Sequence, residues 1–346
     1  VDWPVVFLGA IRAGVVPVAL NTLLNTDQYE YMLADSRSQA LFVSASLLPT
    51  VQPILGKLPF LKHVFVAGGE APPYALSLRG ELQHQASDFA AIDTHPDEPA
   101  FWLYSSGSTG NPKGTKHVHS SLVATADTYG QKVHGITADD VVYSAAKFFF
   151  AYGLGNSLTF PMAAGATAIL LPDRPTPDAV FALMKHHNPT IFYGVPTLYA
   201  AMLASPKGGK ENASQRLRLC ISAGEQLPEE VGRAWMDKYG VEVLDGIGST
   251  EMLHIFLSNR PGDIKLGTTG KAVPGYTLRV VDEQNNDVPD GEVGELLIKG
   301  PSAAEGYWNQ REKSRSTFEG GWCRSGDKYM RDNDGYYTCQ GRTDDM

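Results

Sequence analysis

A loop rich in glycine and hydroxyl groups, set after a buried strand, most constrains what this chain can fold into. The loop reads Tyr104-Ser-Ser-Gly-Ser-Thr-Gly-Asn-Pro-Lys-Gly114; it follows the apolar run 100–103 and precedes a helical pattern that begins near Ser120. Glycine permits positive φ and close backbone approach, so successive N–H groups can converge on an anion. The hydroxyls add donors, and Lys113 adds a positive charge. The sequence therefore predicts a strand, a polyphosphate-binding loop and a helix, in that order.

The two most familiar phosphate-binding patterns do not describe this loop. In the P-loop of nucleoside triphosphatases the lysine is followed by serine or threonine, whereas Lys113 is followed by Gly114. The dinucleotide-binding pattern spaces its glycines as Gly-x-Gly-x-x-Gly, whereas the glycines of this loop fall at 107, 110 and 114. The loop is thus either another kind of phosphate site or a flexible surface loop.

Buried strands alternate with helical patterns until about Leu266. Apolar runs such as 40–43, 141–144 and 190–193 are short, and helical periodicity lies between them. This alternation predicts an α/β fold with parallel or mostly parallel sheets. Beyond Leu266 the helical patterns stop, and short alternating runs between turn residues predict a small distorted β-barrel. We expect an α/β subdomain with the phosphate loop at 1–135, a second α/β subdomain with acyl and adenine sites at 136–262, the β-barrel at 263–341 and a hinge at 342–346.

Composition and charge argue against several classes of function. The 346 residues, 43% of them hydrophobic, suffice for a sizeable core. A formal charge of −9 without a basic run argues against nucleic acid and anionic membranes as partners. The three cysteines are odd in number and widely spaced, which is typical of reduced thiols, and no apolar run reaches transmembrane length. These features predict a cytoplasmic protein that binds neither nucleic acid nor membranes.

Six stretches together resemble one family. The loop at 104–114 closely resembles the signature loop of the adenylate-forming superfamily, which includes acyl-CoA synthetases, nonribosomal adenylation domains and firefly-type luciferases. Five further stretches match that superfamily in order and spacing, and the resemblance covers the whole chain. They are Phe148-Phe-Phe-Ala-Tyr-Gly-Leu-Gly-Asn156, Ser222-Ala-Gly-Glu225, Asp245-Gly-Ile-Gly-Ser-Thr-Glu251, Arg324-Ser-Gly-Asp327 and Gly341-Arg-Thr-Asp-Asp345.

The resemblance assigns many of these residues to an ATP site. It implies that the phosphates lie on the loop, the adenine beside 222–225 and the ribose beside Asp327, whose carboxylate can accept from both hydroxyls. Asp245 would accept from the adenine amine, and Gly246 would leave room for the flat ring. Each of these residues could instead belong to an ordinary turn. The implied nucleotide-binding residues are Ser105, Ser106, Gly107, Ser108, Thr109, Gly110, Ala223, Gly224, Glu225, Asp245, Gly246, Thr250, Asp327 and Arg342.

The resemblance gives the catalytic roles to Lys113, Thr250 and Glu251. Lys113 and Thr250 would act on the phosphates, and Glu251 offers the hard carboxylate oxygens that Mg²⁺ prefers. Adenylation of this kind needs positioning and charge neutralisation rather than a protein nucleophile. Asp344 would be the hinge about which a C-terminal domain rotates. The pair His117-Val-His119 could bind a metal, but no further ligand set is evident, and it receives no role.

Both ends of the chain interrupt a pattern. The chain begins at Val1 inside a helical pattern and stops at Met346 within a polar turn, so we expect an internal fragment of a longer protein. Members of the superfamily carry on their C-terminal domain a lysine that neutralises charge during adenylation, and that domain would begin after Met346. The isolated fragment is therefore expected to bind nucleotide and acid but to catalyse poorly.

The stretch 148–156 indicates the class of acid. Amino-acid-activating relatives usually carry an aspartate near the position of Ala151, and this chain has no acidic residue there. An uncharged aromatic or aliphatic acid therefore fits better than an amino acid. Within the superfamily, the stretches 147–161 and 245–256 most resemble benzoate-CoA ligases. By that resemblance the acid would be surrounded by Ala151, Tyr152, Gly248, His254 and Ile255.

The expected activity is that of an acid–thiol ligase used in the degradation of aromatic compounds. Benzoate and ATP would give an acyl-adenylate and pyrophosphate, and coenzyme A would then displace AMP to give benzoyl-CoA. The alternatives are activation of a substituted benzoate such as 2-aminobenzoate, loading of an aryl acid onto a carrier protein, and a non-catalytic nucleotide-binding relative. The implied partners are a small aromatic carboxylate, ATP with Mg²⁺, and coenzyme A, while the oligomeric state stays open.

Overall fold

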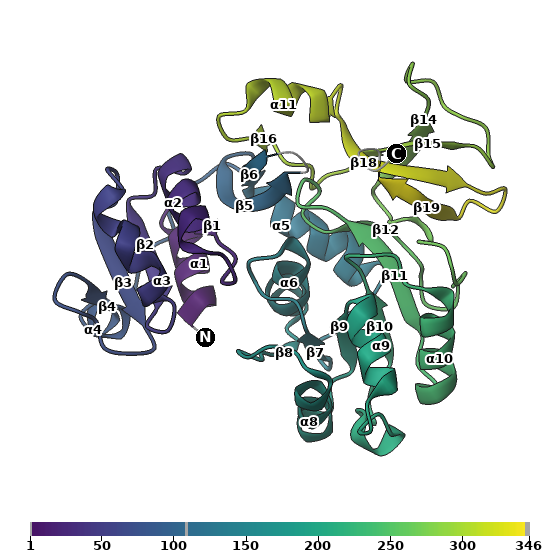
Figure 1. Cartoon of the computed structure of the whole chain (residues 1–346), viewed down its shortest axis with the longest axis horizontal. Helices are drawn as coiled ribbons and strands as arrows, with labels where there is room; N and C mark the ends of the chain where they lie inside the picture. The colour runs from purple at the N-terminus through teal and green to yellow at the C-terminus, as the bar shows by residue number, and fades with distance from the viewer. Residues whose placement is uncertain (1, 108–109, 343–346) are drawn as a thin grey trace. The chain divides into compact units, whose positions relative to one another are not determined.

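The chain forms two compact units, Val1–Gly114 and Thr115–Met346. A computed structural model describes residues 2–107 and 110–342. The first unit runs from purple to blue in Figure 1, and the second continues from blue through green to yellow. The finer division at 135, 262 and 341 that the sequence predicts stays a prediction.

In the first unit, short helices pack on a parallel sheet. Strands β2 (Ala40–Ser44), β3 (His63–Ala67) and β4 (Leu76–Ser77) pair in parallel in this order. Buried side chains of β2 and β3 pack with Tyr29 of helix α2 (Thr26–Asp35). The other elements of this unit are α1 (Asp2–Arg12), β1 (Val18–Ala19), α3 (Leu48–Val51), the 3₁₀-helix η1 (Gln52–Lys57), α4 (Leu78–Gln83) and β5 (Pro99–Gly107).

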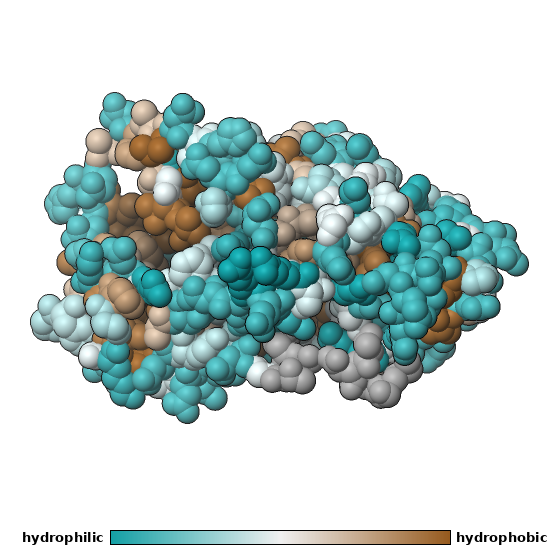
Figure 2. Space-filling view, turned by 90° about the horizontal axis from the view of Figure 1, so that it is seen from above, coloured by the Kyte–Doolittle hydropathy of each residue, from teal (hydrophilic) through white to brown (hydrophobic). Residues whose placement is uncertain are grey.

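Strand β5 contains the apolar run that the sequence predicts to be buried. Phe101 and Leu103 are almost completely buried, and β1 pairs with β5 in parallel, with Ala19 opposite Leu103. Apolar side chains also reach the surface of this unit, where Leu23 and Phe42 are exposed. Figure 2 shows brown, hydrophobic atoms between polar ones on the face of the molecule that it displays.

The second unit is built on a mostly parallel sheet with the strand order β13-β12-β11-β10-β9-β7-β8. The strands from β7 to β11 pair in parallel, whereas β12 and β13 are antiparallel to their neighbours. This arrangement confirms the predicted α/β fold. The strands are β7 (Val141–Ser144), β8 (Thr167–Ile169), β9 (Ile191–Gly194), β10 (Leu219–Ser222), β11 (Val243–Gly248), β12 (Ile255–Ser258) and β13 (Lys271–Ala272).

Both faces of this sheet are buried. In β9, Tyr193 packs into one core cluster and the preceding Phe192 into another. One cluster contains side chains of helices α8 (Pro177–His187), α9 (Pro196–Ala204) and α10 (Glu229–Tyr239), which lie along the sheet in Figure 1. Burial on both faces explains why these strands read as continuous apolar runs. Further helices are α5 (His119–Thr125), the π-helices η2 (Ala126–Gln131) and η3 (Gly155–Thr159), α6 (Ala151–Leu154), α7 (Phe160–Ala164) and the 3₁₀-helix η4 (Lys210–Asn212).

The C-terminal part forms an antiparallel sheet, and its closure into the predicted barrel stays a prediction. Its strands are β14 (Thr277–Val281), β15 (Val293–Lys299), β17 (Phe318–Glu319), β18 (Trp322–Arg331) and β19 (Tyr337–Arg342).

A short helix, α11 (Arg311–Thr317), lies in this part of the chain, so the expectation that helices stop near Leu266 was wrong. The helix has a polar sequence without apolar periodicity, and Ser314 stabilises it locally by accepting from the Tyr307 amide and donating to the Gln310 carbonyl. Within 2–107 and 110–342, no helix combines the length and the apolar character that crossing a membrane requires.

Candidate nucleotide and aryl-acid site

Two of the predicted motifs lie side by side at the carboxyl edge of the central sheet. Strand β10 ends at Ser222, and parallel pairing places Ser222 opposite Asp245 in β11. The motif 222–225 therefore begins next to the motif 245–251. Ligands of open α/β sheets bind at the carboxyl ends of strands. The topology thus brings the two predicted adenine-binding segments together at an edge suited to a ligand.

Asp245 is a buried carboxyl group at this edge. Its side chain is 6% exposed, and Oδ1 accepts from the Leu227 amide at 3.3 Å. Burial raises the pKa of Asp245 to about 8, although backbone hydrogen bonds from Leu227 and Gly246 oppose the rise. A Cβ atom at Gly246 would approach Ile255 and Ser258 to 3.1 Å, so the absence of a side chain there lets β11 and β12 pack closely.

The turn after β10 presents backbone to the surface. Gly224 has φ +98°, a conformation that favours glycine, and the nearest atom to an added Cβ would be 3.8 Å away, in Val195. Ala223 is buried, whereas Gly224 and Glu225 are exposed. The backbone of this turn is therefore accessible, which is compatible with the predicted contact to a flat ring.

The turn that contains Thr250 and Glu251 is held through its carbonyl groups. Leu253 has φ +64°, and three successive carbonyls accept from outside the turn. His117 Nε2 lies 2.8 Å from the Thr250 oxygen, the Ala304 amide 2.8 Å from the Glu251 oxygen, and Ser302 Oγ 2.6 Å from the Met252 oxygen. The partly exposed side chains of Thr250 and Glu251 therefore project from a fixed backbone.

His117 and Tyr307 contribute to this turn although sequence reasoning gave them no role. His117 is fully buried, and burial lowers its pKa to about 4 despite the hydrogen bond to Thr250 and the charge of Glu251. It is therefore a neutral donor to the Thr250 carbonyl at pH 7. Tyr307 donates its hydroxyl to Glu251 Oε1 at 2.7 Å. The only sequence signal for His117 was its position just after the loop, and Tyr307 had none.

Asp327 and Arg342, both predicted to bind nucleotide, lie close to each other. They are opposite each other in β18 and β19, with 3.8 Å between Arg342 Nε and Asp327 Oδ1. Burial raises the pKa of Asp327, while the Arg342 charge lowers it and the Glu251 charge raises it further. Glu251 therefore lies close enough to Asp327 for its charge to affect the pKa of Asp327.

His254, one of the residues predicted to surround the acid, lies in a cluster of aromatic side chains. Its Nε2 lies 3.1 Å from Asn156 Oδ1 and 3.3 Å from the Tyr152 carbonyl, so Nε2–H is the donor. Burial lowers the pKa of His254 to about 3, which makes the imidazole neutral. Its ring centroid lies 4.6 Å from that of Phe160 and 5.7 Å from that of Tyr152. The Tyr152 hydroxyl in turn donates to the Gly194 and Ile221 carbonyls.

The other predicted pocket residues adjoin this cluster. Ala151 opens helix α6 directly before Tyr152. Gly248 pairs with Ile255 across the β11–β12 ladder, and a Cβ at Gly248 would lie 2.6 Å from the His254 carbonyl carbon. Tyr152, His254, Gly248 and Ile255 are thus neighbours, and none of the four has an acidic side chain.

The predicted helix after the phosphate loop is confirmed, because α5 begins at His119, next to the expected Ser120. The described loop residues lie at the end of β5 and in a further strand, β6 (Gly110–Val118), which the sequence did not predict. Lys116 and Thr115 of β6 pair with β16 (Gly306–Tyr307), a long-range pairing that local sequence does not reveal. Ser105, Ser106 and Gly107 lie in β5, and Gly110 and Lys113 lie in β6, whereas Ser108, Thr109 and Asp344 fall outside the described residues.

The roles of the loop residues in phosphate binding stay predictions.

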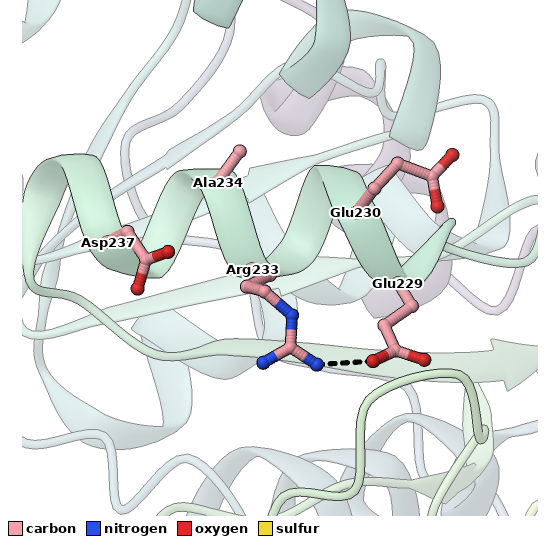
Figure 3. Close-up of a pocket in the computed structure, with 5 residues that line it drawn as sticks. All are labelled: Glu229, Glu230, Arg233, Ala234 and Asp237. Atoms are coloured by element: carbon pink, nitrogen blue, oxygen red, sulfur yellow. Dashed lines mark hydrogen bonds and ion pairs between the residues drawn. The ribbon is translucent and has the colours of Figure 1, made fainter.

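A shallow hollow elsewhere, along the outer face of α10, offers no competing site. Figure 3 shows Glu229, Glu230, Arg233 and Asp237 along one helix face, with Arg233 paired to Glu229. These side chains are charged groups on a solvated helix surface, where Glu229, Arg233 and Asp237 follow one another at intervals of about one turn.

Comparisons with known proteins identify the family of the chain. The family model described as AMP-binding enzyme matches residues 1–308. The benzoate–CoA ligase of Thauera aromatica is 57% identical over 347 residues, which cover 100% of this chain and 65% of that protein. The chain thus spans about two thirds of the length of this curated relative. A benzoate CoA ligase from Burkholderia xenovorans LB400 superimposes with a TM-score of 0.93 at 52% identity, covering 99% of this chain and 68% of the other.

A second solved structure, the anthranilate CoA ligase AuaEII in complex with anthranoyl-AMP, superimposes with a TM-score of 0.97 at 42% identity. It covers 100% of this chain and 67% of the other. The match of the family model over most of the chain, together with these similarities, shows that the chain belongs to the AMP-binding enzyme family.

Proposed function

We propose that this chain carries the nucleotide and acid sites of an ATP-dependent ligase that activates benzoate, or a close aromatic carboxylate, and transfers it to coenzyme A. The observation that supports the proposal is a cluster of uncharged aromatic side chains, around Tyr152 and His254, next to the strand ends that hold the nucleotide motifs. Strand β11 leads into the Thr250–Glu251 turn and pairs with β12, which begins directly after His254. An acid in the pocket would therefore lie close to the predicted phosphate contacts.

The reaction needs the acid carboxylate to attack the α-phosphate of ATP, with pyrophosphate as the leaving group. The chain supplies orientation and donors for this step. The Thr250 hydroxyl would donate to an α-phosphate oxygen from a turn whose carbonyls are fixed by His117 and Ala304. Lys113 would add positive charge to the phosphates. Donors fixed before the reaction stabilise developing charge without a reorganisation cost.

The chemistry of the turn fits Mg²⁺. Within the described ranges, no group of three or more His, Cys, Asp or Glu side chains is arranged to hold a metal. A cation at Glu251 would therefore take most ligands from phosphates and water, which is how proteins usually bind Mg²⁺. When bound, Mg²⁺ would neutralise phosphate charge. Glu251 would be the protein ligand.

The aryl pocket supports an uncharged acid. A neutral His254 and a buried Tyr152 offer no counter-charge for an α-amino group. Aromatic neighbours at ring distances of 4.6 and 5.7 Å can instead pack against a flat ring. The names of the benzoate and anthranilate ligases that resemble this chain agree with an aromatic acid.

One observation favours 2-aminobenzoate as the second candidate. In the part of the chain that the structure describes, His254 Nδ1 is buried and has no hydrogen-bond partner. Because Nε2 carries the proton, Nδ1 is an acceptor. An ortho amino group could donate to it, and a buried unsatisfied polar atom costs about 1–3 kcal/mol. Loading onto a carrier protein has no comparable support.

Calorimetric titration with non-hydrolysable acyl-adenylate mimics tests the proposal. The acyl-sulfamoyl-adenosines of benzoate, 2-aminobenzoate, phenylalanine and acetate share the nucleotide and differ only in the acid. We expect the benzoyl compound to bind at least about tenfold more tightly than the phenylalanyl and acetyl compounds. Tightest binding of the 2-aminobenzoyl compound would select the second candidate. Equal affinities, or preference for phenylalanine, would refute an aryl-acid site.

A further inference from the structure

We propose that Tyr307 is a positioning residue that orients the Glu251 carboxylate to bind the nucleotide's divalent cation through one oxygen, and thereby favours Mg²⁺ over Ca²⁺. The inference rests on the proposed function, because that function assigns the cation to Glu251. It goes further in naming a residue outside the turn and a consequence for cation choice.

The contact between the two side chains is direct. The Tyr307 hydroxyl lies 2.7 Å from Glu251 Oε1, with the hydroxyl as donor and the carboxylate as acceptor. Tyr307 is 5% exposed, and its ring packs against Phe318 at a centroid distance of 5.6 Å. A buried, packed ring gives the hydroxyl a fixed direction. A hydrogen bond to a charged acceptor is also stronger than one between neutral groups.

The segment that carries Tyr307 also holds the backbone of Glu251. The Ala304 amide donates to the Glu251 carbonyl at 2.8 Å, and β16 pairs with β6 so that Tyr307 lies opposite Thr115. Ser302 Oγ donates to the next carbonyl, that of Met252, at 2.6 Å. Residues 302–307 therefore fix both the main chain and the side chain of the proposed metal ligand. Partners of this kind usually orient ligands and tune metal affinity.

The position of the hydroxyl predicts which cations the site accepts. Mg²⁺ requires nearly ideal octahedral geometry and keeps several waters, whereas Ca²⁺ takes more ligands and accepts carboxylates through both oxygens. The hydrogen bond to Oε1 competes with coordination through both oxygens. Removal of the hydroxyl would weaken the orientation that suits Mg²⁺ and remove the competition that disfavours Ca²⁺.

The test measures cation binding without turnover. Binding of Mn²⁺ to the chain with a non-hydrolysable ATP analogue is followed by electron paramagnetic resonance, and Mg²⁺ and Ca²⁺ are titrated as competitors. The variants are Tyr307→Phe and Glu251→Gln, alone and combined, and Glu251→Asp, which withdraws the carboxylate from the hydroxyl. Tyr239→Phe is the matched control, because its hydroxyl donates to the Gly208 carbonyl at 2.8 Å, outside the proposed site.

We expect Tyr307→Phe to weaken Mn²⁺ and Mg²⁺ binding about tenfold, the lower end of the usual effect of such partners. Ca²⁺ binding should change less, so the ratio of Ca²⁺ to Mg²⁺ affinity should rise in Tyr307→Phe and in Glu251→Asp. In the Glu251→Gln background, Tyr307→Phe should have little further effect on cation binding.

Three results would overturn the inference: wild-type cation affinities in a folded Tyr307→Phe chain, an equal loss in the Glu251→Gln background, or an unchanged cation ratio in both Tyr307→Phe and Glu251→Asp. Thermal unfolding checks the fold, and Glu251→Asp keeps the test decisive if Tyr307→Phe does not fold. The benzoyl-sulfamoyl-adenosine titration contains no metal. Absence of a preference for the benzoyl compound in that titration would refute the proposed function. Retained preference for the benzoyl compound, together with unchanged cation binding in Tyr307→Phe, would refute only the role of Tyr307.

Discussion

Replacement of Asp245 by asparagine should change how the stability of this protein depends on pH. Asp245 is buried, and burial raises its pKa from 3.8 to about 8. Between these two values the folded chain keeps this carboxyl protonated, whereas the unfolded chain releases the proton. The folded state therefore binds more protons, and stability must fall as pH rises through this range. The contribution is fully present below about pH 4 and is lost by about pH 8.

The size of the effect follows from the shift. The shift from 3.8 to about 8 spans about four pH units, and each unit corresponds to about 1.4 kcal/mol. The full range is therefore about 5–6 kcal/mol, which is comparable with the total stability of many domains. Asparagine cannot ionise, but its oxygen can still accept from the Leu227 amide, as Oδ1 of Asp245 does. The free energy of unfolding of the variant should therefore rise relative to that of the wild type by about 1.4 kcal/mol per pH unit between pH 5 and 8.

Urea unfolding at pH 5, 6, 7 and 8, followed by tryptophan fluorescence, measures this difference. The difference between the two proteins should be smallest at pH 5 and should grow steadily, with Asp245→Asn more stable at pH 8. Parallel stability curves would refute the argument, because they would mean that Asp245 is already ionised in the folded chain at pH 5. Asp140→Asn is the control, since its difference from the wild type should not vary over this range.

Three further predictions concern individual contacts. Burial raises the pKa of Asp140, but hydrogen bonds from Arg218 and Thr190 outweigh this effect and lower the pKa overall. The free energy of unfolding of the wild type, measured by urea unfolding, should therefore fall as the pH drops below about 4, whereas that of Asp140→Asn should depend less on pH in this range. Gly248→Ala should cost about 1–3 kcal/mol in urea unfolding, because its Cβ would lie 2.6 Å from backbone atoms of His254. His254→Phe should weaken benzoyl-sulfamoyl-adenosine binding in calorimetry by about tenfold or more, since it leaves buried acceptors without the Nε2–H donor; unchanged affinity would exclude His254 from the pocket.

Local sequence patterns predicted the central sheet because its strands are buried on both faces and therefore appear in the sequence as continuous apolar runs. The runs 190–193 and 217–222 became β9 and β10, strands buried on both faces. The strand β6 was missed because residues 110–118 read as a loop rich in glycine, proline and lysine. Its pairing with β16 joins residues about 190 positions apart, and no local periodicity encodes such a contact.

Strand order and register explain which of the predicted motifs lie next to each other. Register alone brings Ser222 beside Asp245, and adjacent strands bring Gly248 to Ile255. The pKa values were not predictable, because they depend on burial by distant residues. His254 shows this most clearly: its low pKa follows from enclosure by parts of the chain about 100 residues away, including Asn156.

The Thr250–Glu251 turn shows how much of a motif's function lies outside the motif. Within the turn the Leu253 amide donates to the Thr250 carbonyl, but the other donors to the carbonyls of residues 250–252 come from elsewhere in the chain. They come from His117, from Ser302 and from Ala304, none of which belongs to the sequence Asp245–Glu251. A chain could therefore keep every letter of this motif and still misplace the carboxylate if these donors were lost. The presence of the motif indicates the chemistry, whereas the donors at 117 and 302–307 determine whether the geometry for that chemistry exists.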